Sequence, residues 1–249
     1  MSRDVSGRRA NGTAAPSPRR PSLGTLTSMT TFEGIPFAAA DFYDELEFTN
    51  TRDWWAAHKD EYEAVVRAPM EALAAALEPE FGAAKAFRPY RDVRFSPDKS
   101  PYKTHQGVVV TTASGMGWYA QVSADGLMTA GGWYAGTADQ LARYRDAVDD
   151  AAAGVSLERI VGVLRAEGYV VGGDVLKTRP RGAPADHPRL DLLRHRTLVA
   201  EREHGAPDWL PTTGTLDRVR ADWRAFRPLL EWLGDHVGES RPWDSRPAD

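Results

Sequence analysis

The residues of this chain that are best suited to chemistry lie in one basic, aromatic run from Arg88 to His105. Arg presents a planar fork that matches a carboxylate or a phosphate, and Lys adds a compact positive charge. If residues 91–95 form a strand, alternate side chains share one face, and the Ser-Pro-Asp-Lys-Ser-Pro segment that follows turns the chain. Several cations can then converge on one anion. The candidate ligand-binding residues of the run are Arg88, Arg91, Arg94, Lys99, Tyr102, Lys103 and His105.

A second basic segment, residues 176–202, could close such a site through Arg179 and Arg181, provided that the two segments meet in space. Within the first run, Asp92 and Asp98 are the candidates for acid–base catalysis, with the arginines stabilising negative charge in the transition state. The same two carboxylates can instead pair with the arginines, which would make the run a structural ion-pair network. The sequence leaves both interpretations open.

Other kinds of reactive site are missing from the sequence. The chain has no cysteine, which excludes disulfides, thiolate metal sites and cysteine nucleophiles. Its six histidines are scattered without the spacing of metal ligands, so we predict no metal and no cofactor. No nucleophile elbow, Walker loop or dinucleotide-binding glycine motif occurs.

Basic residues interleaved with Tyr90, Phe95 and Tyr102 are also typical of surfaces that stack the bases of single-stranded nucleic acid. A formal net charge of −4 opposes this function, because neutralising many phosphates requires a broad basic face. We therefore predict a small anionic ligand that bears a phosphate or a carboxylate. The alternative is a non-catalytic module that contacts nucleic acid or a protein partner with the same face.

The basic run resembles the signature of the family catalogued as domain of unknown function 2461, approximately R-x-x-R-D-x-R-F followed by D-K-x-x-Y. The matching residues are Arg88, Arg91, Asp92, Arg94, Phe95, Asp98, Lys99 and Tyr102. Similar segments at 32–34, 54–59, 131–132 and 176–182 extend the resemblance to about residues 32–236. It implies a mostly bacterial family of soluble proteins, and it implies no activity.

Hydrophobic periodicity predicts the elements that position this run. We expect a helix that Pro36 opens, a longer helix capped by Asn50-Thr51, and later helices that begin at a Thr137 capping box and at Ser156, followed by one from Leu216 to Leu233. Residues 108–110, 118–122 and 127–130 are expected to be strands, the last two joined by an Asp-Gly turn. Helices, then strands, then helices indicate an α+β fold with an antiparallel, twisted sheet packed with several helices.

A chain of 249 residues, with 42% hydrophobic and 27% charged residues, is suited to one domain. We expect a disordered tail over 1–28, a single α+β domain over 29–238 and a loose tail over 239–249, with Met29 a candidate for the native start. No apolar run approaches the ~20 residues that cross a bilayer. Without an export signal or cysteine, we expect a cytoplasmic protein that does not bind membranes. Nothing in the sequence indicates its oligomeric state.

Overall fold

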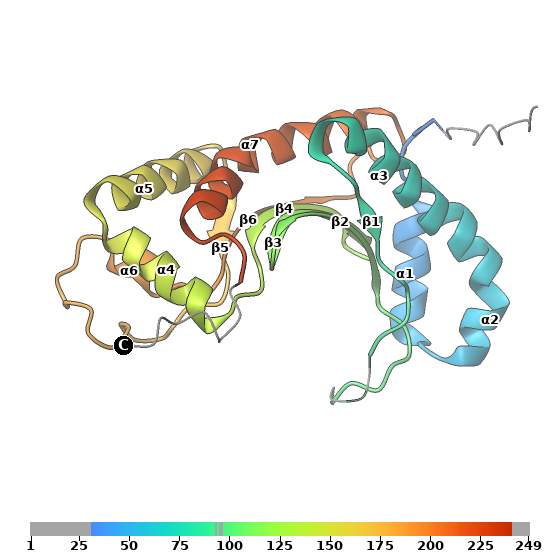
Figure 1. Ribbon diagram of the computed structural model, residues 1–249. Coiled ribbons are helices and arrows are strands. Elements are labelled where there is room, and N and C mark those ends of the chain that lie inside the picture. Colours follow the sequence, from blue (N-terminus) through green and yellow to red (C-terminus); the bar gives the residue numbers. More distant parts are fainter. Residues whose placement is uncertain (1–30, 93, 95–96, 241–249) are drawn as a thin grey trace, which may run out of the picture. The chain divides into compact units, whose positions relative to one another are not determined.

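The computed structural model describes residues 31–92, 94 and 97–240 (Figure 1). The predicted N-terminal tail, Met29 and residues 241–249 lie outside the described residues, and the single domain over 29–238 stays a prediction. The helical elements are α1 (Ala38–Phe48), α2 (Arg52–Glu61), the π-helical η1 (Tyr62–Arg67), α3 (Ala68–Phe81), α4 (Ala138–Asp149), α5 (Ala151–Ala166), α6 (Leu190–Leu193) and α7 (Gly214–His236). The strands are β1 (Lys85–Ala86), β2 (His105–Ala113), β3 (Met116–Ser123), β4 (Gly126–Trp133), β5 (Val170–Gly172) and β6 (Leu198–Gly205).

The six strands form one sheet in the order β1-β2-β3-β4-β6-β5, and each neighbouring pair is antiparallel. The predicted hairpin is confirmed, because Ser123 pairs with Gly126 across the turn between β3 and β4. Helices precede and follow this meander, so the α+β fold with an antiparallel sheet is confirmed. The sequence did not predict β1, β5 or β6.

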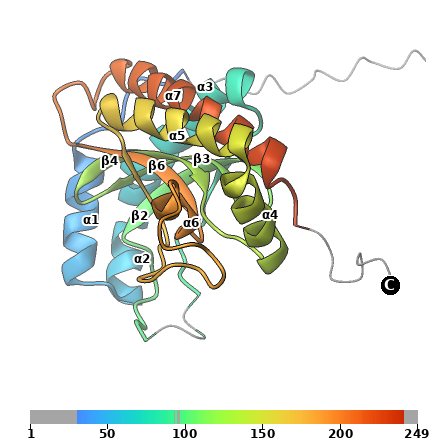
Figure 2. The ribbon, with the colours of Figure 1, turned by 90° about the vertical axis from the view of Figure 1, so that its left-hand side faces the viewer.

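The sheet is curved, and its two faces differ because successive side chains of a strand point to opposite sides. Figure 1 shows α3 and α7 along the convex face, and Figure 2 shows α5 beside α7. Two indole hydrogen bonds join β3 to α7. The Trp118 indole nitrogen donates to the carbonyl oxygen of Trp223 (2.8 Å), and the Trp223 indole nitrogen donates to the carbonyl oxygen of Tyr119 (3.1 Å). The core therefore lies between the convex face and the helices, and no described helix packs on the concave face (Figure 1).

The segment between β1 and β2 differs from the prediction. Arg91, Asp92 and Arg94 are not in a strand, and Val93, Phe95 and Ser96 lie outside the described residues. Instead, Tyr90 and Tyr102 form an isolated antiparallel bridge, and the described residues between them, 91, 92, 94 and 97–101, lie outside the sheet. Prolines explain this outcome, because a proline has no amide hydrogen to donate to a strand ladder.

Several predicted helix starts are correct and one is wrong. Thr51 Oγ1 accepts a hydrogen bond from Trp54 N (3.2 Å) at the start of α2, and the Thr137 capping box begins α4. Ser156, however, lies inside α5, which begins at Ala151 after Asp150. Asp150 Oδ1 accepts hydrogen bonds from Ala152 N (2.9 Å) and Ala153 N (2.8 Å), so Asp150 is the cap. None of the described helices is long and apolar enough to span a bilayer.

Candidate functional site

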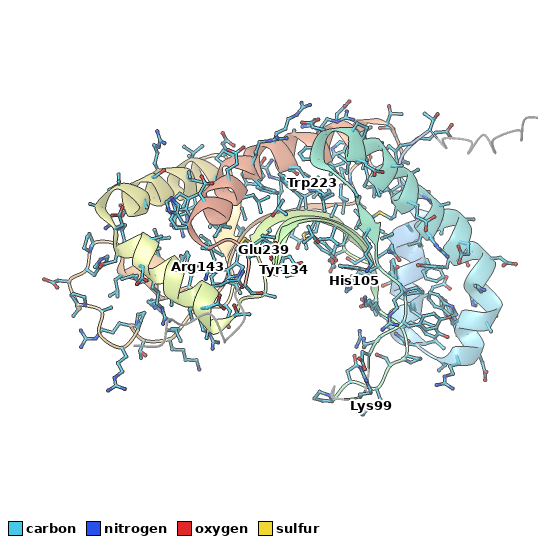
Figure 3. The ribbon with its side chains drawn as sticks, in the orientation of Figure 1. Lys99, His105, Tyr134, Arg143, Trp223 and Glu239 are labelled. Carbon is cyan, nitrogen blue, oxygen red and sulfur yellow. The ribbon has the colours of Figure 1, made fainter. Side chains whose placement is uncertain are left out.

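The concave face of the sheet contains a cavity of about 400 Å³. One row of facing residues, Val109, Tyr119, Ala130 and Glu201, crosses its floor from β2 to β6. Most of the lining is apolar, aromatic or glycine, and a single carboxylate reaches it. The lining residues are Phe87, Val109, Gly117, Tyr119, Met128, Ala130, Gly131, Gly132, Tyr134, Val199 and Glu201. Figure 3 shows Tyr134 and His105 on this side of the sheet and Trp223 on the other.

The Tyr119 side chain is held by Gln121 of its own strand and lies over the neighbouring strand β2. Its hydroxyl donates a hydrogen bond to Gln121 Oε1 (2.8 Å), and its ring centre lies 6.0 Å from that of Phe87. A Cβ added at Gly107 would lie 2.3 Å from the Tyr119 hydroxyl. Gly107 is therefore the residue that allows the Tyr119 ring to lie over β2 and form one wall of the cavity.

Phe87 is positioned by buried hydrogen bonds that begin in the π-helical segment. The Tyr62 hydroxyl of η1 donates to Gln106 Oε1 (2.6 Å), and Gln106 Nε2 donates to the Phe87 carbonyl oxygen (2.8 Å). The backbone nitrogen of Phe87 donates to Gly107 O (2.9 Å). Segments of π-helix occur frequently at functional sites. Here the segment places Tyr62 where it can hold the backbone of a cavity-lining residue.

Four basic residues lie close to one another, and we call Arg88, Arg91, Lys103 and His105 the basic cluster. The Lys103 ammonium lies 4.9 Å from the centre of the Phe87 ring. Burial lowers the pKa of Lys103, and so do Arg88 and Arg91. Burial, Lys103 and Arg91 likewise lower the pKa of His105. No carboxylate among the described residues forms an ion pair with Arg88 or Lys103.

The two carboxylates of the run are both paired with arginines of the run, one of which, Arg91, belongs to the basic cluster. Arg91 forms an ion pair with Asp98, and Arg94 forms one with Asp92 (2.6 Å). Hydrogen bonds from the Arg94 side chain and backbone lower the pKa of Asp92, which is exposed. Neither Asp92 nor Asp98 lines the cavity. Lys99 is exposed at the far end of the loop (Figure 3).

Tyr102 anchors the run to the helices. It is only 6% exposed, and its ring stacks on Trp55 with 4.1 Å between ring centres. Asn50 Nδ2 donates to the Tyr102 carbonyl oxygen (3.0 Å), while Tyr102 N donates to Asn50 Oδ1 (3.1 Å). Tyr102 is therefore a buried anchor next to Lys103, and its part in ligand binding stays a prediction.

Arg179 and Arg181 lie apart from the basic cluster. Both are exposed in the segment between β5 and α6. Figure 1 shows this segment, in orange, beside α6, whereas residues 88–92 and 97–103 lie at the opposite edge of the sheet, next to β1 and β2. The two basic segments therefore do not meet in the described part of the chain, and the second does not close the cavity.

Glu201 is a cavity residue that the sequence analysis missed. It is half-buried, and no described residue pairs with its carboxylate. Burial raises the pKa of the neighbouring Glu203, as do Glu201 and Asp125. The available signal was the alternation of Ala200, Glu201, Arg202, Glu203 and His204. This alternation is typical of a strand with two different faces.

A buried carboxylate cluster on the convex face was also missed. Asp222 of α7 is 2% exposed. Its Oδ1 accepts from the Tyr169 hydroxyl (2.8 Å) and Arg202 (3.2 Å), and its Oδ2 accepts from Thr129 (2.7 Å) and lies 2.6 Å from His204 Nε2. Burial alone would raise the pKa of Asp222, but hydrogen bonds from His204, Thr129 and Tyr169 bring it below its usual value. These contacts fasten α7 to β4 and β6.

No group of three or more His, Asp or Glu in the described part of the chain is arranged to hold a metal ion. A family model with the description "Conserved hypothetical protein (DUF2461)" matches residues 38–232. No curated protein and no solved structure matches the chain. The matched region runs from the start of α1 into α7 and includes both the cavity and the basic cluster.

Proposed function

The chain belongs to the DUF2461 family, and from this premise we propose that its basic cluster and concave cavity bind a small molecule that bears a phosphate or a carboxylate. The proposal concerns binding. It assigns no chemistry to Asp92 or Asp98, because each carboxylate is paired with an arginine and neither lines the cavity.

The environment of Lys103 is the observation that carries this proposal. Its half-buried ammonium lies near two arginines of the same charge, and its pKa is lowered first by burial and then by repulsion from Arg88 and Arg91. Asp98 pairs with Arg91, but no described carboxylate pairs with Arg88 or Lys103. An anion placed among these cations would relieve the repulsion and accept charge-assisted hydrogen bonds, each contributing about 1.5–3 kcal/mol.

The cavity beside the cluster supports a ligand larger than a simple ion. Its volume of about 400 Å³ lies in the range of small-molecule sites. Phe87 belongs to both features, because it lines the cavity and lies beneath Lys103. An anionic group held by the cluster would therefore place the rest of the same molecule against an apolar, aromatic wall.

Single-stranded nucleic acid is the second candidate. The observation that favours it is the exposure of two tyrosines, Tyr90 of the basic run at 52% and the cavity-lining Tyr134 at 51%. Exposed aromatic rings beside cations can stack bases in a sequence-tolerant manner. Arg94 is different, because it forms an ion pair with Asp92, and this supports the interpretation of that part of the run as a structural ion-pair network.

Isothermal titration and thermal stabilisation would test the proposal. The probes are inorganic phosphate, ribose 5-phosphate, small dicarboxylates and a short single-stranded DNA. We expect a phosphate- or carboxylate-bearing probe to bind the wild type and to bind Lys103→Met and Arg88→Gln about tenfold more weakly, equivalent to about 1.4 kcal/mol each. Arg179→Gln is the matched control, since it removes one exposed positive charge away from the cluster.

Equal affinities for all four proteins would contradict the proposal, as would a failure of every small anion to bind. Tight binding of the oligonucleotide alone, with a steep decrease as salt rises, would support the second candidate, because phosphate-backbone contacts release counterions.

A further inference from the structure

We propose that the ligand is nucleotide-like, with an anionic group at one end and a flat ring carrying an amino group at the other, and that Glu201 recognises that amino group. This inference rests on the proposed function, because the basic cluster must hold the anionic end. It adds the chemical class of the ligand and a specificity-determining residue on the opposite side of the cavity.

The first argument is the state of the Glu201 carboxylate. Glu201 lines the cavity and is half-buried, yet no described residue donates a hydrogen bond to it or pairs with it. Its neighbour Arg202 points to the other face of the sheet, where it contacts Asp222. A partly buried carboxylate without a donor is costly. A ligand nitrogen that donates hydrogen bonds would satisfy it.

The second argument is the distribution of charge across the cavity. Glu203 lies two residues along the same face of β6, so the negative charges of Glu201 and Glu203 gather at the β6 end. The basic cluster lies at the β2 end, where His105 begins the strand and Lys103 precedes it. A ligand that complements both ends must carry a negative charge at the end near β2 and hydrogen-bond donors at the end near β6.

The third argument is the width of the cavity. Lys103 approaches it through Phe87, whose ring centre lies 4.9 Å from the Lys103 ammonium and 6.0 Å from the Tyr119 ring centre. Val109 of β2 and Glu201 of β6 are separated by β3 and β4 in one continuous row. Three strand spacings of about 4.8 Å correspond to about 14 Å between the two backbones, and the curvature of the sheet and the side chains shorten this span. A nucleoside monophosphate has a suitable length, whereas inorganic phosphate would reach only one end.

The fourth argument is the middle of the cavity, which suits a flat ring. Aromatic side chains of Phe87, Tyr119 and Tyr134 line it, and the floor includes Gly117 and Gly132. A Cβ at Gly132 would lie 2.3 Å from Leu198 O, so the packing of β4 against β6 requires a residue without a side chain at this position. Aromatic rings stack well on flat heterocycles, and the two glycines of the floor have no side chain to prevent a close approach.

Matched nucleotide pairs provide the test, because their members differ at one exocyclic group. Cytidine and uridine 5′-monophosphates form one pair, adenosine and inosine 5′-monophosphates form the other, and ribose 5-phosphate lacks the base. Titration calorimetry of the wild-type chain should show the amino-bearing member of each pair binding about tenfold more tightly. In Glu201→Gln this preference should fall to about twofold or less, while ribose 5-phosphate affinity stays unchanged.

Glu231→Gln, which neutralises an exposed glutamate of α7, is the control and should keep the wild-type preference. Equal affinity for both members of each pair in the wild type overturns the inference without any variant, so the test does not depend on the folding of Glu201→Gln. An unchanged preference in a folded Glu201→Gln overturns it as well.

The outcomes separate this inference from the proposed function. If ribose 5-phosphate binds and Lys103→Met weakens it, the anion site stands even when the paired nucleotides bind equally. If no phosphate-bearing probe binds the wild type, the anion site fails and the nucleotide assignment fails with it.

Discussion

The ammonium nitrogen of Lys103 lies 4.9 Å from the centre of the Phe87 ring. This contact connects two features that are described separately above, since Lys103 belongs to the basic cluster and Phe87 lines the concave cavity. Both residues are held by the helices, Phe87 through Gln106 and Tyr62, and Lys103 through the adjacent Tyr102, which Asn50 binds. The geometry of the site can therefore be altered at several points without removing a charge.

The chemical reactivity of Lys103 should report the repulsion within the basic cluster. A lowered pKa leaves a larger fraction of the amine neutral at pH 8, and the neutral form is the nucleophile. Because Arg88 contributes to the lowering, Arg88→Gln should raise the pKa of Lys103 and slow its acetylation. Peptide mass spectrometry after timed labelling would measure the rate. An unchanged rate at Lys103, with exposed Lys177 as the internal standard, would contradict the electrostatic account.

Substitution of Gly107 should deform the cavity wall with a limited effect on the core. In Gly107→Ala the new methyl group would overlap the Tyr119 hydroxyl, so the ring must move from its position over β2. We expect at least a tenfold loss of ligand affinity, measured by titration calorimetry. Gly162→Ala in α5, where a Cβ would meet nothing within 4 Å, is the control. It should leave affinity unchanged and raise stability by up to about 1 kcal/mol, because alanine favours a helix.

Asn50 should affect both stability and binding, because it holds the backbone next to Lys103. Asn50→Ala removes two hydrogen bonds to Tyr102, each contributing about 1 kcal/mol, and loosens the cluster. Urea unfolding and phosphate titration would measure the two effects. Thr51→Ala is the adjacent control, since it removes only the cap of α2 at a cost of about 1 kcal/mol. Binding that weakens equally in both variants would mean that general destabilisation, and not Asn50, is the cause.

Asp222 should be among the most sensitive positions for stability. Asp222→Asn replaces a buried carboxylate that has four partners, and we expect a loss of about 3 kcal/mol in urea unfolding at pH 7. A loss below about 0.5 kcal/mol would mean that the cluster does not fasten α7 to the sheet. Thr129→Val, which removes one donor, should cost about 1 kcal/mol.

The effect of Asp222 on stability should also depend on pH, with a determined sign. The folded-state pKa of Asp222 is lowered, so the unfolded chain binds the proton more readily. The contribution of Asp222 to the free energy of unfolding is therefore fully present above about pH 3.9, its pKa in the unfolded chain, and decreases as the pH falls through its pKa in the folded chain. The difference in unfolding free energy between wild type and Asp222→Asn should be constant from pH 7 to about 5 and shrink below about pH 4. A difference that grows on acidification would contradict the assignment.

The start of α5 offers a direct comparison between two candidate caps. Asp150→Ala removes a side chain that accepts two backbone hydrogen bonds and should cost about 1 kcal/mol. Ser156→Ala lies inside the helix and should change stability by less than about 0.5 kcal/mol, since alanine is a good helix former. Thermal or urea unfolding of both variants would decide, and the reverse order would restore Ser156 as the cap.

Local patterns in the sequence determined much of the fold. The apolar spacing of Trp55, Val66, Met70 and Leu77 predicted the long helical region, and the Asp-Gly turn predicted the β3–β4 hairpin. These predictions hold because a helix or a hairpin is specified by residues that are close together in the chain. The family signature was equally readable, since it depends only on the order of the residues.

Strand β6 shows where local patterns were insufficient. Only its first three residues are uniformly apolar, and the charged residues that follow hid it, although Arg202 and His204 point to a buried partner on α7. That partner, Asp222, lies about twenty residues further along the chain, beyond the reach of any local pattern. The same strand brings Glu201 to the cavity, so the missed strand concealed a candidate site residue.

The sequence by itself determined which residues of the basic run could bind an anion. The tertiary structure alone decided which of them form ion pairs or enter the core and which lie near the cavity. Arg94 pairs with Asp92 and Arg91 with Asp98, Tyr102 enters the core, and Arg179 and Arg181 lie in the segment that follows β5, the edge strand opposite to β1. Lys103 remains beside the cavity-lining Phe87 with Arg88 near it, and no described carboxylate forms an ion pair with either. The physical reason is that residue type sets what a side chain can bind. Long-range packing sets which other charges surround it, and that packing follows from strand pairing across the whole sheet.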